Sequence, residues 1–399
     1  MLKLSISRID ELFSAISNER TLYLPIESDG LVQFGQWSDG VSAQLDKLLT
    51  TKSPKDFFFP HTEDIAAFKM QGKELTIKDK RSPIEPFVVF GVRACDARSL
   101  ELLDRVFLSE PVDTFYQARR ENGIVITSAC FKPEESCFCT AFKAASINPL
   151  LANFRENILP GEEAHECSTE ARYEHLCADE AVAEYSPESR QNGVNRDRLY
   201  IDALNPGGDI AVWIFGEVLY WQAYTKRGKA LTQKLEELFE HADETAVEQE
   251  KEKAKEIFAK LPFGNLNLES FTPEVLLEKF NSPEWEKLNP ACISCGTCTF
   301  ICPTCHCYDI QDHNTGDEVV RFRCWDSCMY SDFTLMAHGN PRTSKLERFR
   351  QRYMHKLIYF PDKNDGIYAC VGCGRCVQKC PVSMNIVKVA KALGVDKDV

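Results

Sequence analysis

The first 230 residues alternate between short apolar runs and segments in which apolar residues recur at helical intervals. The runs PFVVFGV at 86–92 and GIVITSAC at 123–130 favour buried strands because they are short, apolar and rich in Val and Ile. Between them lies a helical pattern that starts at Asp96, which stands where a helix N-cap would. Two further runs within 207–225 predict a hairpin around Gly216. This alternation predicts an α/β domain.

Two stretches interrupt the alternation. Residues 147–205 are polar, rich in Glu and Asn and broken by prolines, so we interpret them as an insertion or a long surface excursion. Residues 231–261 have an amphipathic pattern with charges of both signs, which predicts one long helix with a solvated outer face. Prolines between 262 and 283 predict a boundary, so we assign 1–283 to the N-terminal α/β domain.

Composition limits the classes of protein to consider. The chain has 399 residues, 44% of them hydrophobic, and a net charge of −13, which argues against a general nucleic-acid binder. No run approaches the roughly 18 to 20 apolar residues of a membrane-spanning helix. The first residues show no apolar core with a cleavage site, so we expect a cytoplasmic protein.

Cysteine is the residue that changes this picture. The chain has 18 cysteines, of which twelve fall between Cys292 and Cys380. In a reducing compartment, tight repeated spacings indicate metal sites rather than disulfides. Two segments, CISCGTCTFICP at 292–303 and CVGCGRCVQKCP at 370–381, share the spacing C-x2-C-x2-C-x3-C followed by proline. The second motif is therefore an internal repeat of the first.

This spacing is typical of proteins with two [4Fe–4S] clusters, in which three close cysteines hold one cluster and the fourth ligates the other. We assign one cluster to Cys292, Cys295, Cys298 and Cys380, and the second to Cys370, Cys373, Cys376 and Cys302. Gly296, Gly372 and Gly374 are expected to let the backbone pass close to the clusters. The alternative, zinc, favours two separated C-x2-C pairs.

The spacer between the two motifs predicts the fold of the second domain. Leu346, Phe349, Tyr353 and Leu357 form a helical apolar stripe within it. We therefore expect an α+β chain, in which the α/β domain is followed by a mainly helical, two-cluster ferredoxin-like domain at 284–399. The same helix carries six cations, which would favour cluster reduction, dock an acidic partner or form a solvated face: Arg342, Lys345, Arg348, Arg350, Arg352 and Lys356.

Four upstream cysteines suggest a third metal site. Cys95 follows the first predicted strand and Cys130 ends the second, and ligands collect at the carboxyl ends of such strands. Cys137 and Cys139 come shortly afterwards. A third cluster is one interpretation of this group, and buried structural thiols are the other.

The remaining cysteines have no clear assignment from spacing. His165, Cys167, His175 and Cys177 form two H-x-C units, which are either a zinc site or chance exposure in a polar stretch. Cys324 and Cys328 have an i, i+4 spacing that would place them on one helical face. With Cys305 and Cys307 they are packing thiols, hydrogen-bond partners of cluster sulfurs or ligands of a further cluster, and we lean against metal binding.

The ordered set of motifs resembles a known family. ACD at 94–96, CFC at 137–139, the two cluster motifs, WDSCM and HKLIY together resemble the A subunits of anaerobic sulfite reductases and the beta subunits of sulfhydrogenase-type nickel–iron hydrogenases. The resemblance is weakest over 147–205 and 231–283. It implies an electron-transfer subunit with two [4Fe–4S] clusters, working between a flavin subunit that uses NAD(P)H and a separate catalytic subunit. The family pattern also includes Cys95, Cys130, Cys137 and Cys139.

The leading hypothesis is thus an iron–sulfur relay subunit of a soluble oxidoreductase complex. No G-x-G-x-x-G fingerprint is present, so FAD and NAD(P) are expected on a partner subunit. An alternative is a self-contained thiol or cluster reductase acting on a disulfide or polysulfide near Cys95 and Cys139. A regulatory protein that uses clusters as a switch is a third hypothesis.

Overall fold

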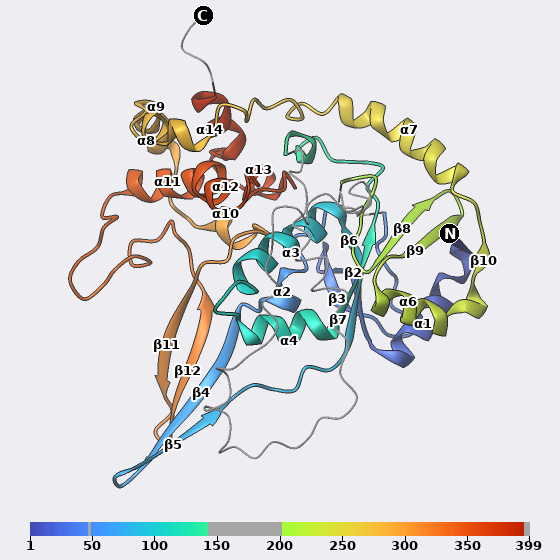
Figure 1. Ribbon diagram of the computed structural model, residues 1–399, viewed down its shortest axis with the longest axis horizontal. Coiled ribbons are helices and arrows are strands. Elements are labelled where there is room, and N and C mark those ends of the chain that lie inside the picture. Colours follow the sequence, from blue (N-terminus) through green and yellow to red (C-terminus); the bar gives the residue numbers. More distant parts are fainter. Residues whose placement is uncertain (47–48, 143–201, 395–399) are drawn as a thin grey trace, which may run out of the picture. The chain divides into compact units, whose positions relative to one another are not determined.

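The computed structural model describes residues 1–46, 49–142 and 202–394, and all of them belong to one compact unit (Figure 1). Most of the predicted insertion at 147–205, with its two H-x-C units, lies outside the described residues. The predicted boundary at residue 283 does not coincide with a division of this unit, and it stays a prediction.

An eight-stranded sheet forms the centre of the N-terminal part. Its strand order is β10-β1-β9-β8-β7-β6-β2-β3, with β2, β6, β7 and β8 parallel and the outer pairs antiparallel. The strands are β1 (Leu2–Ser5), β2 (Thr21–Ser28), β3 (Leu31–Gln36), β6 (Phe87–Arg93), β7 (Gly123–Ser128), β8 (Ile210–Phe215), β9 (Val218–Ala223) and β10 (Glu240–His241). The predicted strands and the hairpin at Gly216 are confirmed.

Helices cover both faces of this sheet. On one face α1 (Ile9–Glu19) and α6 (Lys226–Lys234) pack their apolar sides against the sheet. On the other face lie α3 (Ala94–Phe107) and α4 (Thr114–Asn122), together with the short α2 (Lys55–Phe58). The prediction of a mixed α/β architecture is therefore confirmed.

The single long helix predicted at 231–261 is wrong. The segment divides into the end of α6, a short 3-10 turn at Glu236–Leu238, strand β10 and the separate helix α7 (Thr245–Ala259). The break arises because β10 pairs with β1, where Lys3 lies opposite Glu240. Pairing with β1 at this sheet edge gives hydrogen-bond partners to backbone groups that would otherwise bond to each other within a continuous helix.

The C-terminal part contains many short helices and two strands. The helices are α8 (Leu276–Phe280), α9 (Glu284–Leu288), α10 (Thr297–Phe300), α11 (Lys345–Met354), α12 (Phe360–Lys363), α13 (Arg375–Gln378) and α14 (Ile386–Leu393), with a π-helical turn at His355–Tyr359. Strands β11 (Tyr308–Asn314) and β12 (Val319–Trp325) join β4 (Thr62–Gln71) and β5 (Glu74–Asp79) in a second sheet, in the order β11-β12-β4-β5. A mainly helical domain is thus not confirmed.

The apolar stripe of α11 is confirmed, since Phe349, Tyr353 and Leu357 are buried in the C-terminal core. That core also takes in Phe138 and Phe142 from the N-terminal part. The two parts therefore share packing around the cysteine motifs. Within the described ranges, no helix combines the length and apolar character that a membrane crossing needs.

Candidate metal centre

The structure brings together the four cysteines assigned to the first cluster. Cys292, Cys295, Cys298 and Cys380 line one pocket, which also includes Met329 and Tyr353 among its lining residues. Gly296 precedes α10 with a φ of +74°, which lets the chain turn tightly between the second and third cysteine. Of these four cysteines only Cys295 is exposed.

The second set of cysteines gathers deeper in the molecule. Cys370 and Cys373 are buried. Burial raises the pKa of the Cys370 thiol to about 12, with a further contribution from the nearby Cys302 and Cys373 thiols. Burial and the thiols of Cys370, Cys373 and Cys302 also raise the pKa of Cys376. The segment that carries Cys302 contacts the second motif directly, since the Thr304 hydroxyl donates to the carbonyl of Ala369 at 2.8 Å.

A site for a single metal ion needs a different arrangement of side chains from a site for a cluster. In the described part of the chain, no three His, Cys, Asp or Glu side chains are placed to hold one metal ion. A cubane binds its four thiolates through separate iron atoms, so this finding does not bear on the cluster assignment.

Three buried cations lie among the cysteines without a carboxylate partner in the described ranges. Lys55, Arg352 and Lys356 are each at most 4% exposed. Lys55 donates to the carbonyls of Cys302 and Cys305 at 3.3 and 2.9 Å. Buried cations are costly unless negative charge compensates them, and thiolate-bound clusters carry such charge.

Arg352 gives the clearest indication that the residues present fit two clusters. Its Nη2 donates to the carbonyl of Cys298 at 3.1 Å, while Nε and Nη1 are buried with no partner among the described residues. The thiols of Cys298 and Cys376 both raise its pKa, against the effect of burial. The guanidinium therefore lies between the two cysteine groups with donors to spare for sulfur acceptors.

Five of the six cations predicted on the basic helix donate to backbone carbonyls rather than facing solvent alone. Lys345 donates to Cys292, Arg348 to Met329 and Thr343, Arg350 to Phe280, Arg352 to Cys298, and Lys356 to Ala369. Several of these carbonyls lie in or next to the cysteine loops, so α11 and the turn that follows it hold the loops in place.

A buried ion pair attaches the second motif to the N-terminal part. Arg375 binds both carboxylate oxygens of Asp96, and its Nε donates to the carbonyl of Thr50 at 3.0 Å. Asp96 was predicted to be a helix N-cap, but Arg93 occupies that position and Asp96 lies inside the first turn of α3. Its carboxylate is used for this pair instead.

Two glycines of the second motif accommodate a protein loop. A Cβ at Gly372 would lie 2.4 Å from the carbonyl oxygen of Phe138, and one at Gly374 would lie 2.6 Å from that of Ser136. The Phe138 amide donates to the Gly372 carbonyl at 2.8 Å. The CFC segment at 137–139 is thus packed backbone to backbone against the second motif.

The tentative third site is only partly assembled. Cys130 and Cys137 lie 3.5 and 3.9 Å from Nη2 of Arg93, whose Nε and Nη1 are buried without a described partner. Burial raises the pKa of Cys139 to about 12, and the Cys130 and Cys137 thiols raise it further. These three cysteines therefore form one group.

Cys95 is placed differently. The Cys95 thiol lies near the Arg93 guanidinium, as the other three cysteines do, but it also lies near the second motif. Burial, Asp96 and the Cys373 thiol all raise the pKa of Cys95. A nucleophilic thiol needs a lowered pKa and access to solvent. The raised pKa values of Cys95 and Cys139 thus give no support to a thiol reductase centred on them.

The structure also shows where Cys305, Cys307, Cys324 and Cys328 lie. Cys324 lies in β12 opposite Asp309, and Cys328 lies in the turn beyond it, so the predicted shared helical face is wrong. The Cys305 thiol lies close to that of Cys302, and the Cys307 thiol lies close to that of Cys328. Their role as packing thiols, hydrogen-bond partners or metal ligands stays a prediction.

Sequence reasoning missed Lys55, Arg93 and Arg375. Lys55 comes from a segment far from the motifs and shows no pattern of its own. Arg93 and Arg375 carry a weak signal, since each lies within two residues of a cysteine in a motif that had been singled out.

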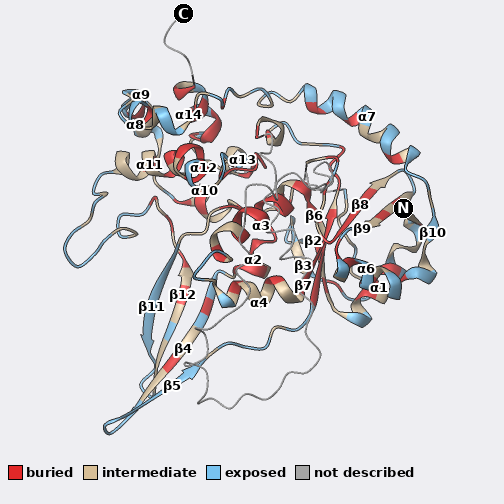
Figure 2. Cartoon of the chain, in the orientation of Figure 1, coloured by how far each residue is buried: buried red, intermediate tan, exposed pale blue. Residues whose placement is uncertain are grey.

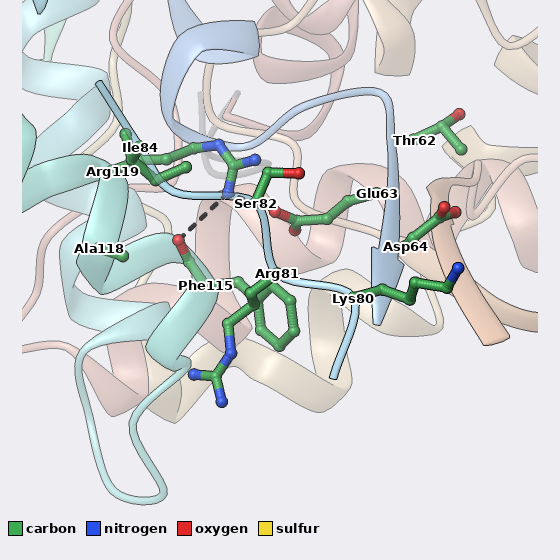
Figure 3. A pocket seen from close by; sticks show the side chains of 10 residues that line it. All are labelled: Thr62, Glu63, Asp64, Lys80, Arg81, Ser82, Ile84, Phe115, Ala118 and Arg119. Carbon is green, nitrogen blue, oxygen red and sulfur yellow. Dashed lines mark hydrogen bonds and ion pairs between the residues drawn. The ribbon is translucent and has the colours of Figure 1, made fainter. Parts of the chain in front are cut away.

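A second cavity, of about 350 Å³, lies between β4, the segment after β5 and α4 (Figure 3). Most of its charged side chains form ion pairs: Arg119 pairs with Glu63, Lys80 with Glu318, and Arg81 with Asp79, whereas Asp64 is exposed. The lining residues include no cysteine, so this hollow is not comparable to the cysteine region.

Comparison with known proteins supports the cysteine assignment at the level of the family. Residues 291–384 match the 4Fe-4S dicluster domain family, and all eight motif cysteines fall inside that range. Over 390 residues, 97% of this chain and 96% of the relative, the chain is 29% identical to a Pyrococcus furiosus protein named sulfhydrogenase 2 subunit beta. No solved structure matches. The resemblance found in the sequence is thereby confirmed.

Proposed function

We propose that this chain, a relative of a sulfhydrogenase beta subunit with a 4Fe-4S dicluster domain, is the electron-transfer subunit of an oxidoreductase complex. Its partners are a flavin subunit that uses NAD(P)H and a separate catalytic subunit of the hydrogenase or sulfite reductase type. Each [4Fe–4S] cluster would supply a one-electron carrier.

The observation that carries the proposal is the crossed grouping of the cysteines. Cys380 of the second motif lines the pocket of the first, and Thr304, two residues after Cys302, donates to the carbonyl of Ala369, which precedes Cys370, at 2.8 Å. These contacts support an exchange of fourth ligands, which would join two clusters closely. Two adjacent redox centres suit a relay.

The cations have two roles in this arrangement. Lys356 donates to Thr304 Oγ1 and the Ala369 carbonyl at 2.8 and 2.9 Å, which joins the segments that carry Cys302 and Cys370. Together with Lys55 and Arg352, it also places positive charge where the clusters would bring negative charge. Nearby cations stabilise the reduced form of such a centre.

The two centres differ in access. Cys295 is exposed, and Ile293 beside it is an exposed apolar residue, whereas Cys370 and Cys373 are buried. We infer that the first site exchanges electrons with a docked partner, while the second is shielded inside the subunit.

We further propose a third iron–sulfur site at Cys130, Cys137 and Cys139, next to Arg93. The unpartnered donors of this buried guanidinium support the presence of an acceptor there. Iron and sulfide analysis of the isolated chain distinguishes the cases, since two cubanes give roughly eight iron atoms and three give roughly twelve. A Cys139→Ser variant with unchanged iron content would refute the third site.

Anaerobic purification of the tagged chain from its own cells tests the main proposal. We expect a stoichiometric complex that contains flavin and is reduced by NADH or NADPH. Isolation of the chain as a free monomer, with clusters but without partners, would contradict the relay function.

A further inference from the structure

Two cysteines outside both motifs meet at one end of the second sheet. Cys307 directly precedes β11, and Cys328 follows the end of β12. Tyr308 lies opposite Trp325 where the two strands reach this end of the sheet. The pairing continues for one further step, because the Asp326 amide donates to the Cys307 carbonyl at 3.0 Å. The β11–β12 hairpin thus brings the two cysteine segments side by side.

A turn after β12 holds Cys328 beside Cys307. The Tyr330 amide donates to the Ser327 carbonyl at 2.9 Å, and the Ser327 hydroxyl is hydrogen-bonded to that of Thr299, within the first motif, at 2.8 Å. The Cys307 and Cys328 thiols lie close together, and the Cys328 amide is directed at the Cys307 sulfur. Neighbouring thiols on such a backbone can form a disulfide without a large movement of the chain.

The surroundings of the pair favour Cys307 as a nucleophile. The Cys328 thiol and, to a smaller extent, Lys356 and Lys55 lower the pKa of Cys307 to about 7, although burial opposes them. The contact with the Cys307 sulfur, together with burial, raises the pKa of Cys328. One thiol is thereby available as an attacking thiolate near neutral pH, while the other keeps its proton until the second step.

The pair is also accessible. Cys307 and Cys328 are both partly exposed, whereas Cys370 and Cys373 of the second motif are buried. Strand β11, which begins directly after Cys307, is exposed along its whole length (Figure 2). A small reagent in solution can therefore approach the pair at this end of the sheet.

The two predicted clusters do not need these cysteines as ligands. The repeated motifs together supply eight cysteines, which is four for each cubane. Within the ranges that the structure describes, no three His, Cys, Asp or Glu side chains are placed to hold a single metal ion, and this includes the surroundings of Cys307 and Cys328. The pair is thus available for thiol chemistry.

We propose that Cys307 and Cys328 are a redox-active pair that reduces small disulfides by thiol–disulfide exchange. The Cys307 thiolate attacks one sulfur of R–S–S–R, which forms a mixed disulfide and releases RS⁻. The Cys328 sulfur then gives up its proton and attacks the Cys307 sulfur, which closes the Cys307–Cys328 disulfide and releases RSH. The two cysteines lose two electrons, which the two halves of R–S–S–R gain. The reverse reaction with a dithiol restores both thiols, and neither direction needs a cluster or a partner subunit.

Oxidised glutathione is the probe that tests this proposal. The full-length chain with its clusters is purified anaerobically and incubated with oxidised glutathione. Free thiols are then alkylated, and disulfides are mapped by mass spectrometry of unreduced peptides. We expect a Cys307–Cys328 disulfide that dithiothreitol reverses, with unchanged iron content. Recovery of both cysteines as alkylated thiols, or a disulfide from either one to another cysteine, would overturn the inference.

Two variants give a second readout. In Cys328→Ser, the mixed disulfide of Cys307 with glutathione should accumulate, because no second thiol displaces it. Cys324→Ser is the matched control, since burial and the carboxylates of Asp309 and Asp326 raise the pKa of Cys324, and this variant should still close the disulfide. Loss of iron in Cys328→Ser but not in Cys324→Ser would show that the pair ligates metal, and the inference would then be wrong.

Discussion

Arg352 is a buried cation that lies near both cysteine groups. Replacing it with Gln removes a buried cation near both, so the reduced state of each cluster loses stabilisation. We expect both midpoint potentials to shift to more negative values in an EPR-monitored redox titration. Arg352→Lys, which keeps the charge, should shift them much less.

Arg350 provides the matched control for this prediction. It lies on the same helix but donates to the Phe280 carbonyl and packs 3.6 Å from that ring. Arg350→Gln should leave both potentials in place. A shift of only one potential in Arg352→Gln would show that the guanidinium does not serve both centres.

Asp209 stabilises the N-terminal sheet far from the cysteines. Its carboxylate accepts hydrogen bonds from the Val125 amide, the Thr225 hydroxyl and Arg227. Burial alone would raise the pKa of Asp209, but Arg227 and these hydrogen bonds lower it to about 2. Because the folded pKa is depressed, the stabilisation is complete above about pH 4 and is lost as the pH falls toward 2.

Asp209→Asn leaves Arg227 without its partner, which typically costs about 3 kcal/mol. The melting temperature of the variant should therefore lie several degrees below that of the wild type. The difference should be the same at pH 6 and pH 9, since Asp209 is ionised at both. A difference that vanished at pH 6 would contradict this explanation.

Among the elements, the contact between the CFC loop and the second motif is the most sensitive to volume. Gly372 has a φ of +62° and no room for a Cβ, which would lie 2.4 Å from the Phe138 carbonyl. Gly372→Ala should separate the two loops and lower the iron and sulfide content per chain.

A control variant at Gly216, in the turn between β8 and β9, distinguishes backbone strain from a steric clash of the added Cβ. Its φ is +57°, close to that of Gly372, but no atom lies within 4 Å of the place that a Cβ would occupy. Gly216→Ala should cost about 1 kcal/mol of stability and leave the iron content unchanged. Equal iron loss in both variants would show that backbone strain, rather than loop contact, is responsible.

The elements also show what sequence could and could not predict. The strands β6, β7 and β8 are largely apolar and largely buried, so their burial was readable from local pattern. The second sheet was missed because β5 and β11 are exposed along their whole length and their alternation spans only a few residues. The split of 231–261 depends on pairing with β1, a contact between distant segments that no local pattern records.

For the site, too, some features could be predicted from the sequence and others could not. The crossed grouping of the cysteines stays a prediction, which rests on ligand spacing as a local constraint imposed by cluster geometry. The inward orientation of the cations on α11 was not predictable from the sequence, because a cation on a helix has the same sequence pattern whether it faces water or a backbone carbonyl. Cys95 was grouped with Cys130 on strand position and on the family pattern, neither of which could show that its thiol also lies near Cys373.

At the scale of the whole molecule, one compact unit combines an eight-stranded sheet, two cysteine groups and a second sheet. The ion pair between Asp96 and Arg375 joins the first sheet to the second cysteine group, and Lys55 joins that group to Trp325 at the end of β12. The N-terminal part is thus a structural support for the proposed redox centres.

The central claim is that the two motifs exchange their fourth ligands. It is tested most directly by EPR spectra of the reduced chain in which Cys298, Cys380, Cys373 and Cys302 are replaced singly by Ser. We predict that the Cys298 and Cys380 variants perturb the same cluster signal, and that the Cys373 and Cys302 variants perturb the other. If the Cys380 variant instead altered the signal affected by Cys373→Ser, each motif would hold its own cluster and the account would be wrong.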